Sequence, residues 1–335
     1  NYEGKIIVLT TKNNANNKLS VYRNQSSNVI IKRMRFSGSN LFFRLVEYFF
    51  FYLEGLFSLF RYNAKTVLYF ESISSWPALI YKRIKEKKIQ LMVHYHEYTD
   101  PESSEGKTFL SEWMQKMEKR MYQRFSWISQ TNEVRLAMFR ENNKLEHLQS
   151  SLFHILPNYP SHSWLQMSSG QYSNKKVKKL VFVGSLGYKN MYLQEVIDWL
   201  GNHPDEFSLD IYAYNMDDKA KQVLENNQNK NIRYCGGSDY QSLPEILKNY
   251  DVGLVIYKPF SQNTIHAVSN KVFEYLACGL DVWFSDDMTY TLKYVRTDVY
   301  PKGIPRNVKE LDSFDFESAI VKDNLEYEPS TFFYE

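Results

Sequence analysis

Residues 268–285, which read VSNKVFEYLACGLDVWFS, predict a loop, a short helix and a buried strand in direct succession. Ser269 and Asn270 both have the short polar side chain that caps a helix N-terminus, and residues 271–276 continue as the helix. Gly279 is suited to the left-handed backbone in which many helices end. The apolar residues that follow, 282–284, predict a buried strand.

The helix and the loop before it can bind a phosphorylated ligand. The N-terminal amides of the helix point into residues 261–268, and such N–H groups bind phosphate well. Glu274 lies one turn inside the helix, where its carboxylate can accept hydrogen bonds from neighbouring hydroxyl groups. This arrangement suits a nucleotide sugar; the alternative is that Glu274 only caps or solvates the helix.

These residues resemble the donor-site helix of GT-B glycosyltransferases, and in particular the large retaining glycosyltransferase family four. Its members carry a Glu followed by small residues and Cys-Gly or Ala-Gly, as Glu274 is followed here by residues 277–279. The start Asn-Lys-x-Phe-Glu-Tyr is common in the bacterial surface-polysaccharide enzymes of that family. The resemblance implies that Glu274 holds the donor ribose and that Ser269, Asn270 and Lys271 bind the donor phosphates.

His266 marks a departure from the family pattern. The fuller family motif has a second Glu eight positions before the first, in contact with the donor sugar, and His266 stands at that position here. The resemblance implies that His266 faces the sugar or the leaving group. The identity of the transferred sugar therefore does not follow from the motif.

Length and charge limit the classes of protein to consider. The chain has 335 residues, of which 43% are hydrophobic and 24% charged, so it is long enough for two ordinary domains with substantial cores. The net charge of +3 is too small, without clustering, to indicate a nucleic-acid partner. We therefore expect small-molecule or glycan ligands and no nucleic acid.

Cysteine content and hydropathy predict a cytoplasmic protein. The two cysteines, Cys235 and Cys278, indicate neither a disulfide framework nor a zinc site. The first residues lack the pattern of a signal peptide, and no run of roughly 18 uncharged apolar residues occurs. We expect no spanning helix, with contact at the inner face of the membrane as an open option.

The first half of the chain alternates apolar strands with helices. We expect strands at residues 6–9, 66–70, 90–94 and 127–129 and within 153–160, and helices at residues 40–60, 76–88 and 107–124 and after a cap at Thr131 or Asn132. Residues 10–17 form an asparagine-rich segment that contains no glycine. It is either a solvated loop or the mouth of a binding cleft. Residues 161–179 are polar, as expected of an interdomain linker.

Residues 40–60, NLFFRLVEYFFFYLEGLFSLF, are the most aromatic part of the chain. Arg44, Glu47 and Glu54 exclude a membrane-spanning helix, and their spacing leaves a wide apolar face on an amphipathic helix. This face can pack on the first sheet, or it can lie partly in lipid next to the cations of Arg61, Lys65 and residues 82–88. The two interpretations are compatible.

A second candidate site follows the strand at residues 90–94. The segment HYHEYTDP contains His94, His96, Glu97 and Asp100 at the place where a doubly wound sheet binds ligands. Relatives have a His-Glu or His-Asp pair here, close to the reacting sugar, and His96 with Glu97 matches it best. We expect His94 to be a hydrogen-bonded interior residue. We also expect His94 and His96 to point to opposite sides of the strand, which argues against a metal ion.

The second half repeats the alternation and predicts a parallel sheet. The strand at residues 180–183 ends in a turn at Gly184 that can admit a diphosphate, and Lys189 stands where relatives often keep a phosphate-binding residue; a simple tight connection is the alternative. Tyr240 follows a later strand at the place where GT-B enzymes bind the nucleobase, although it can equally be a packing residue. Further strands are expected at residues 209–214, 232–235, 252–257 and 282–284, and helices at 191–200, 219–226, 242–249 and 271–276.

Together these features predict an α/β protein of GT-B architecture, with two Rossmann-like doubly wound parallel-sheet domains facing a cleft. We expect domains at residues 1–165 and 175–320 and a tail at 321–335 that returns to the first domain. The resemblance implies retaining transfer from a UDP- or GDP-sugar to a glycan or lipid-linked acceptor, without cofactor or metal. The alternatives are another GT-B activity, such as an epimerase or an inverting transferase, and a catalytically degenerate protein that only binds a nucleotide sugar.

Overall fold

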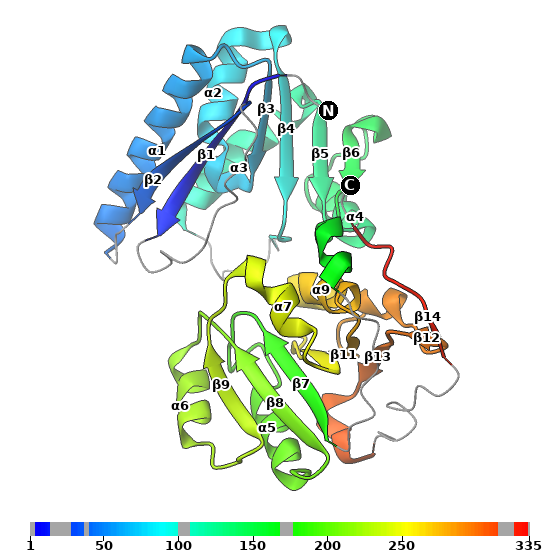
Figure 1. Ribbon diagram of the computed structural model, residues 1–335. Helices are drawn as coiled ribbons and strands as arrows, with labels where there is room; N and C mark the ends of the chain where they lie inside the picture. Colours follow the sequence, from blue (N-terminus) through cyan, green and yellow to red (C-terminus); the bar gives the residue numbers. More distant parts are fainter. Residues whose placement is uncertain are drawn as a thin grey trace. The chain divides into compact units, whose positions relative to one another are not determined.

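A computed structural model describes residues 4–13, 28–36, 40–99, 108–167, 177–313 and 325–333, and the chain divides into two compact units, Asn1–Pro157 and Asn158–Glu335 (Figure 1). The division precedes the expected domain end at residue 165. The second unit begins before residue 165 because Trp164, in the 3-10 helix His162–Met167, is buried in its core. Residues 168–176 of the expected linker lie outside the described residues.

The first unit is built on a four-stranded parallel sheet in the order β3-β4-β5-β6 (Figure 1). Its strands are β3 (Thr66–Phe70), β4 (Gln90–Tyr95), β5 (Trp127–Gln130) and β6 (Phe153–Ile155). The connecting helices are α2 (Trp76–Lys85), α3 (Phe109–Lys119) and α4 (Glu133–Asn142). Alternate strand residues such as Val67, Leu91 and Ile128 form one core with α2 and α4, as period-two patterning requires.

Two helices of this unit end earlier than predicted. Helix α2 stops at Lys85 because Glu86 has a φ of 46°, which a helix interior does not allow, and the 3-10 turn Glu86–Lys88 follows. Helix α3 stops at Lys119, and residues Tyr122–Arg124 form a separate 3-10 turn. Residue 107, the expected start of α3, lies outside the described residues.

A separate parallel pair, β1 (Ile6–Asn13) and β2 (Val29–Phe36), precedes helix α1 (Leu41–Arg61). Strand β1 continues through residues 10–13, which we expected to be loop, because they pair with residues 33–36 of β2. Residues 14–17 of that expected loop are outside the described part. Strand β2 escaped prediction because Lys32, Arg33 and Arg35 interrupt its apolar pattern.

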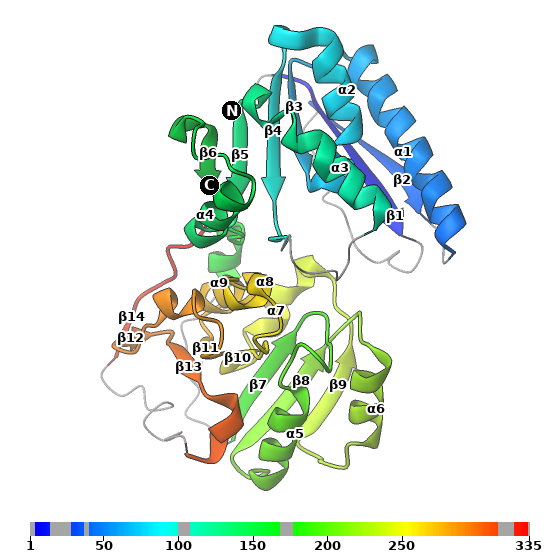
Figure 2. The same ribbon diagram turned by 180° about the vertical axis from the view of Figure 1, so that it is seen from behind.

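The second unit has a six-stranded parallel sheet in the order β13-β11-β10-β7-β8-β9 (Figure 2). The strands are β7 (Lys178–Val183), β8 (Phe207–Tyr212), β9 (Ile232–Gly236), β10 (Val252–Val255), β11 (Asp281–Ser285) and β13 (Gly303–Arg306). The helices are α5 (Leu193–Asn202), α6 (Asp218–Asn226), α7 (Leu243–Leu247), α8 (Gln262–Ile265) and α9 (Asn270–Ala277).

Each face of this sheet has its own core. Leu180 and Phe182 of β7 pack with α5, whereas Val181 and Val183 of the same strand pack with α7 and α9. From β7 the chain runs outward to β8 and β9 and then returns to place β10 on the other side of β7. The carboxyl ends of β7 and β10 are therefore the switch point at which doubly wound sheets bind their ligands.

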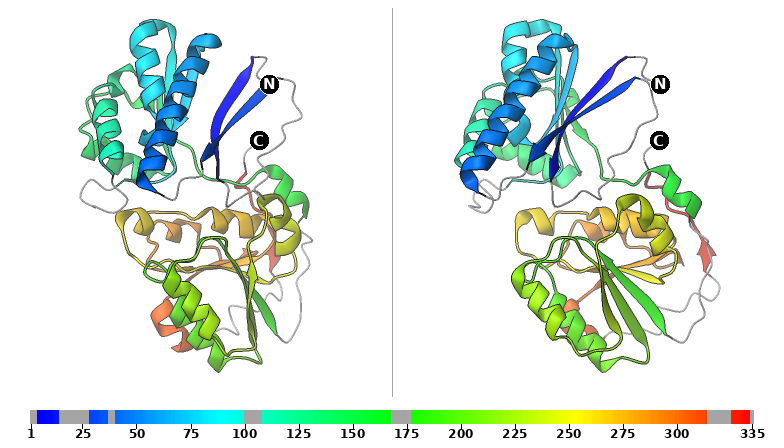
Figure 3. Two further views of the ribbon diagram at one scale, coloured as in Figure 1. Left: turned by 90° about the vertical axis from the view of Figure 1, so that its left-hand side faces the viewer. Right: turned by 60° about the vertical axis from the view of Figure 1, so that its left-hand side comes forward.

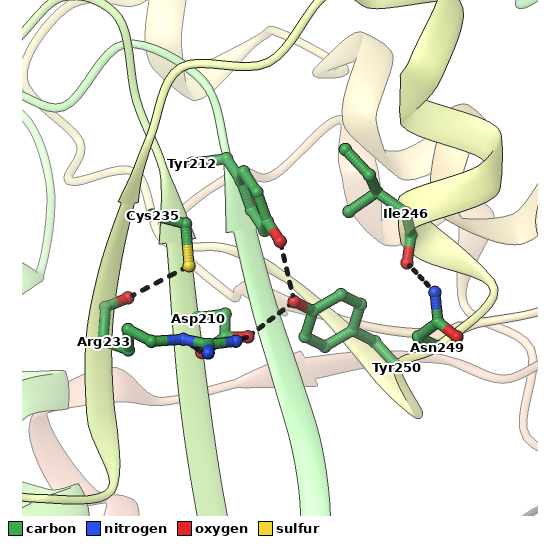
Figure 4. A network of polar contacts seen from close by, with 7 residues as sticks. All are labelled: Asp210, Tyr212, Arg233, Cys235, Ile246, Asn249 and Tyr250. Atoms are coloured by element: carbon green, nitrogen blue, oxygen red, sulfur yellow. Dashed lines mark hydrogen bonds and ion pairs between the residues drawn. The ribbon is translucent and has the colours of Figure 1, made fainter.

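A polar network holds the edge strand β9 to the rest of the second sheet (Figure 4). Asp210 of β8 accepts a hydrogen bond from Arg233 Nε at 3.0 Å and another from the Tyr250 hydroxyl at 2.6 Å. The Tyr212 hydroxyl lies 3.1 Å from that of Tyr250. The network ties β8 and β9 to the turn between α7 and β10.

The described residues of the tail pack within the second unit. Strand β14 (Glu326–Tyr327) pairs with β12 (Val299–Tyr300), and the ring of Phe332 lies 5.3 Å from Phe273 and 5.5 Å from Tyr159. Residues 314–324 and 334–335 are outside the described part.

Candidate functional site

Helix α9 begins and ends as its sequence predicts. The Ser269 side chain caps the helix by accepting from the Lys271 N–H at 3.4 Å, and Gly279 follows the end of the helix with a φ of 79°. The Tyr275 hydroxyl accepts a hydrogen bond from the Val183 N–H at 3.0 Å, which links α9 to the end of β7. Tyr275 also fills the space beside Gly253 of β10, where a Cβ would lie only 2.1 Å from the ring. These two contacts of Tyr275 fix the position of α9 against β7 and β10.

Glu274 is buried, at 2% exposure, and forms an ion pair with Lys271 one turn earlier in α9. A buried carboxylate needs such a partner, because removal from water strongly disfavours an unpaired charge. Helix capping by Ser269 places the first N–H groups of α9 beside the same pair. Near one helix terminus the structure therefore gathers an acid, a cation and backbone donors.

Tyr240 extends this group toward the exit of β9. Its ring lies 5.0 Å from buried Trp164, and the Lys271 Nζ lies 5.9 Å from the Tyr240 ring centroid. The ring remains 38% exposed. Tyr240, Lys271 and Glu274, which were separate candidates in the sequence, are thus joined by successive contacts, although the Glu274 side chain itself is buried.

The segment before α9 is more ordered than the predicted loop at residues 261–268. Helix α8 lies within it, and Ser261 and Thr264 cap its start reciprocally. His266 follows directly, with its Nε2 atom 3.1 Å from the Gln262 Oε1 atom. The prediction of a plain loop was wrong because the reciprocal Ser-Thr capping went unrecognised.

Gly184 and Lys189 lie in the turn after β7. Gly184 has a φ of 154°, in the region that favours glycine, and its N–H donates to the Tyr212 carbonyl at 3.0 Å. Lys189 is exposed, and among the described residues no hydrogen bond or ion pair joins it to Glu274. The turn is held to the end of β10 by the Lys258 N–H, which donates to the Asn190 carbonyl at 2.9 Å.

An open depression of about 420 Å³ lies at the same edge of the sheet. Its lining comes from the segments that follow β10, β11 and β13, and consists of Pro259, Ile265, Asp286, Asp287, Thr289, Asn307 and Lys309. Because Ile265 directly precedes His266, the depression lies beside the α8 segment.

In the first unit, His96 and Glu97 lie at the end of β4, as predicted, and a third residue holds them. Glu71 Oε1 accepts hydrogen bonds from the backbone N–H of His96 at 2.6 Å and of Glu97 at 3.2 Å. Arg135 Nη1 donates to the His96 carbonyl at 2.9 Å. The His96 ring stacks on Phe70 at 5.4 Å. The turn after β4 is therefore held by Glu71 through its N–H groups and by Arg135 through its carbonyl.

Glu71 was missed from the sequence, although a signal was present. It directly follows β3 and has a φ of 58° with a ψ of 149°, a backbone conformation that non-glycine residues rarely adopt. Burial raises the pKa of its carboxyl to about 7. The strand-end argument that selected Glu97 after β4 applies equally to Glu71 after β3, the neighbouring strand.

His94 is an interior residue, as predicted. It is 1% exposed, its Nδ1 atom lies 2.7 Å from the Ser129 hydroxyl, and burial lowers the pKa of its imidazole to about 4, with a smaller effect from His96. The expectation that His94 and His96 point to opposite sides was wrong. Their ring centroids are 4.5 Å apart, because residues two apart in a strand share a face.

The described part of the chain contains no group of three or more His, Cys, Asp or Glu side chains placed to hold a metal ion. Asp100, the last candidate of the His94 segment, lies outside the described residues. Of the two free cysteines, Cys278 is buried after α9 and Cys235 is half-buried on β9.

Deeper in the first unit, Glu118 of α3 is fully buried beneath the end of β3. The hydroxyls of Tyr69 and Ser72 donate to its two carboxylate oxygens, each at 2.5 Å. Burial raises the pKa of Glu118 to about 7. This second acid was also absent from the sequence-based candidates, because helix periodicity alone gives no sign that a glutamate is buried.

Over more than nine tenths of its length the chain shares the GT-B fold with solved glycosyltransferases. The Anabaena protein HepE, solved in complex with UDP, is 11% identical, with a TM-score of 0.60 over 94% of this chain and 92% of its own. The UDP-forming α,α-trehalose-phosphate synthase of Burkholderia xenovorans is 9% identical, with a TM-score of 0.62 over 92% and 90%. The lipopolysaccharide outer core galactosyltransferase WaaB is 10% identical, with a TM-score of 0.57 over 96% and 92%.

These likenesses confirm the predicted α/β architecture of parallel sheets. No protein-family model matches the chain, and no curated protein sequence matches it significantly. The predicted membership of glycosyltransferase family four therefore stays a prediction.

Proposed function

We propose that the protein is a glycosyltransferase that moves a sugar from a nucleoside diphosphate sugar to a glycan or lipid-linked acceptor, as in the synthesis of bacterial surface polysaccharides. The observation that carries the proposal is the buried Glu274–Lys271 pair beside the start of α9, at the switch point of the second sheet. The fold shared with a protein solved in complex with UDP supports a UDP-sugar, and a GDP-sugar is the alternative donor.

The donor is bound by the second unit in this proposal. Glu274 accepts hydrogen bonds from the ribose hydroxyls, and the Lys271 ammonium and the N–H groups that follow Ser269 bind the diphosphate. The exposed ring of Tyr240 forms a wall for the nucleobase. The contacts that join Tyr240 to Lys271 and Lys271 to Glu274 support a single extended ligand across these residues.

Three further residues complete the donor side. Asn270 is the first residue of α9, where its N–H group is free of an intrahelical acceptor. Gly184 lets the backbone approach the diphosphate, and exposed Lys189 binds the phosphates from the same turn. Among the residues proposed to bind the nucleotide sugar, Lys189 is included for its position in this turn alone. No hydrogen bond or ion pair joins it to Glu274 among the described residues.

His96, Glu97 and His266 act near the reacting sugar in this proposal. His266 faces the sugar or the leaving group, His96 stabilises developing charge, and Glu97 orients it. Glu71 is a positioning residue that fixes the turn containing His96 and Glu97. With retention of configuration, the donor β-phosphate accepts the acceptor proton, so no protein nucleophile is needed. The chain then contributes positioning and charge stabilisation.

Nucleotide binding tests the proposal directly. We expect UDP or GDP to stabilise the protein in a thermal-shift assay, because a ligand that binds only the folded state raises its stability. Glu274→Ala should weaken binding by about 1.5 to 3 kcal/mol in isothermal titration calorimetry, through loss of a charged acceptor. Glu225→Ala, which removes an exposed acid from α6, is the matched control and should bind like the parent. Parent-like affinity of Glu274→Ala would show the ribose assignment to be wrong.

Turnover separates transfer from the alternatives. A transferase should release the nucleoside diphosphate when an acceptor is supplied, and it should hydrolyse the donor slowly without one. A protein that only binds would do neither, and an epimerase would change the sugar without releasing nucleotide. His266 is the reason to test these alternatives, because it stands where the family four motif has a glutamate.

We further propose that transfer needs no divalent metal. The ammonium of Lys271 and the N-terminal amides of α9 can offset the diphosphate charge. Activity should persist in excess EDTA. Complete loss of transfer in EDTA, with recovery in manganese or magnesium, would contradict this.

A further inference from the structure

Helix α1 is packed along two of its sides. One side lies against α2 (Figure 3). There Tyr52 is buried, and the Gly55 backbone approaches Pro77 so closely that a Cβ would be 3.1 Å from its ring. A second side meets β2, where the Lys32 Nζ donates to Glu54 Oε1 at 2.6 Å and to the Ser58 hydroxyl at 3.1 Å. Both contacts lie within the first unit.

The remaining side of α1 is apolar and exposed. Nine large apolar side chains there are between 36% and 67% exposed. At about 100° per residue, they cover an arc of about 160° around the helix. They are Phe42, Phe43, Leu45, Val46, Phe49, Phe50, Leu53, Phe57 and Phe60. We call this set the α1 stripe. A surface helix normally has its polar residues on the outward side, so the α1 stripe marks an interaction surface.

Cations lie at the C-terminal end of the stripe. Arg61 and Lys65 are exposed there, whereas Arg44, near the start of the helix, points to the opposite side at about 100° per residue. The Arg61 guanidinium lies 6.0 Å from the Phe57 ring centroid, and the Lys85 ammonium of α2 lies 6.0 Å from that of Phe60. Phenylalanines flanked by basic side chains are typical of helices that lie in the interface of an anionic bilayer.

We propose that the protein docks on anionic membranes through the α1 stripe, with the helix lying in the plane of the headgroups. Among the described residues no helix is long and apolar enough to cross a bilayer, so the contact is peripheral. A second copy of the chain fits less well, because it would offer no opposite charge to the basic end of the stripe, whereas a layer of anionic headgroups does.

This inference goes beyond the sugar transfer proposed above, and it can be tested without donor or acceptor. The full chain is mixed with vesicles of phosphatidylcholine alone or with added phosphatidylglycerol, at low and high salt, and sedimented. We expect the parent to sediment with the mixed vesicles at low salt. High salt should weaken the binding, because charges at the headgroups are screened over about 10 Å at 0.1 M salt.

Matched variants separate binding through the α1 stripe from non-specific adsorption to vesicles. Phe42→Ser/Phe49→Ser removes two exposed rings and should lower the vesicle partition coefficient by at least about tenfold. Phe109→Ser removes an 87% exposed ring from α3 and should leave it unchanged. Arg61→Gln/Lys65→Gln should lower binding and its salt dependence, whereas Lys230→Gln, at an exposed site in the second unit, should not. Because all these side chains are exposed, melting temperatures should stay close to the parent's.

Three outcomes would overturn the proposal. The first is a parent that does not bind mixed vesicles at low salt, and the second is a double phenylalanine variant that sediments like the parent. The third is a dimer in analytical ultracentrifugation that dissociates in Phe42→Ser/Phe49→Ser and does not bind vesicles, which would assign the α1 stripe to a second copy.

Discussion

Each unit of the protein buries a glutamate near its strand-end site, but the two acids are stabilised differently. Glu274 of the second unit is ion-paired with Lys271. Glu118 of the first unit accepts hydrogen bonds from the neutral hydroxyls of Tyr69 and Ser72, and burial raises its pKa to about 7. Similar burial therefore has different consequences for the stability of the fold. Removing the cation from an ion-paired buried acid destabilises the fold, whereas a buried acid held only by neutral hydroxyls destabilises it by becoming ionised.

The largest effect is expected from Lys271→Met. This variant keeps most of the apolar stem but leaves the buried Glu274 carboxylate without its cation, which costs about 3 kcal/mol of unfolding free energy. Urea denaturation at neutral pH measures it. The double variant Lys271→Met/Glu274→Gln should recover most of the loss, because no uncompensated charge remains. If the single variant were as stable as the parent, the comparison between the two acids would fail.

Glu118→Gln should act in the opposite direction. The raised pKa of Glu118 means that its protonated form is favoured on folding, so its contribution is complete below about pH 4.5 and is lost as pH rises through about 7. The variant should therefore be more stable than the parent at pH 8, by on the order of 2 kcal/mol, with the difference vanishing near pH 4. Chemical denaturation at several pH values tests this. A difference that is independent of pH would mean that the carboxyl does not titrate there.

Glu71→Gln should have the smallest effect, and it concerns activity. The carboxyl of Glu71, whose pKa burial raises to about 7, accepts the N–H groups of His96 and Glu97 more strongly when ionised. The neutral amide should lower kcat by about fivefold at pH 8, from about 1 kcal/mol of weaker hydrogen bonding.

The pH profile separates positioning from mere stability. The parent should lose activity as pH falls through about 7, whereas Glu71→Gln should be flat there, with KM for the donor unchanged. An unchanged profile in the variant would contradict a positioning role for Glu71.

Local rules were enough for helix α9. The cap at Ser269, the left-handed Gly279 and the apolar strand after it each act over a few residues, so the predicted succession matches the structure. Strand β3 was equally accessible, because its apolar run does not depend on distant residues. Strand β2 was not, since its charges hide the pattern and only its pairing with β1 shows it to be a strand.

The sequence by itself determined which residue types lie at the strand ends and which side of each helix is apolar. Only the tertiary structure decided which strand ends are neighbours, and this is why Glu71 joins His96 across 25 positions of the chain. It also decided which apolar sides are covered: Trp164 is buried in the second unit, whereas the α1 stripe remains exposed. The physical reason is that periodicity fixes the direction of a side chain relative to its own helix or strand, while burial depends on what packs against it.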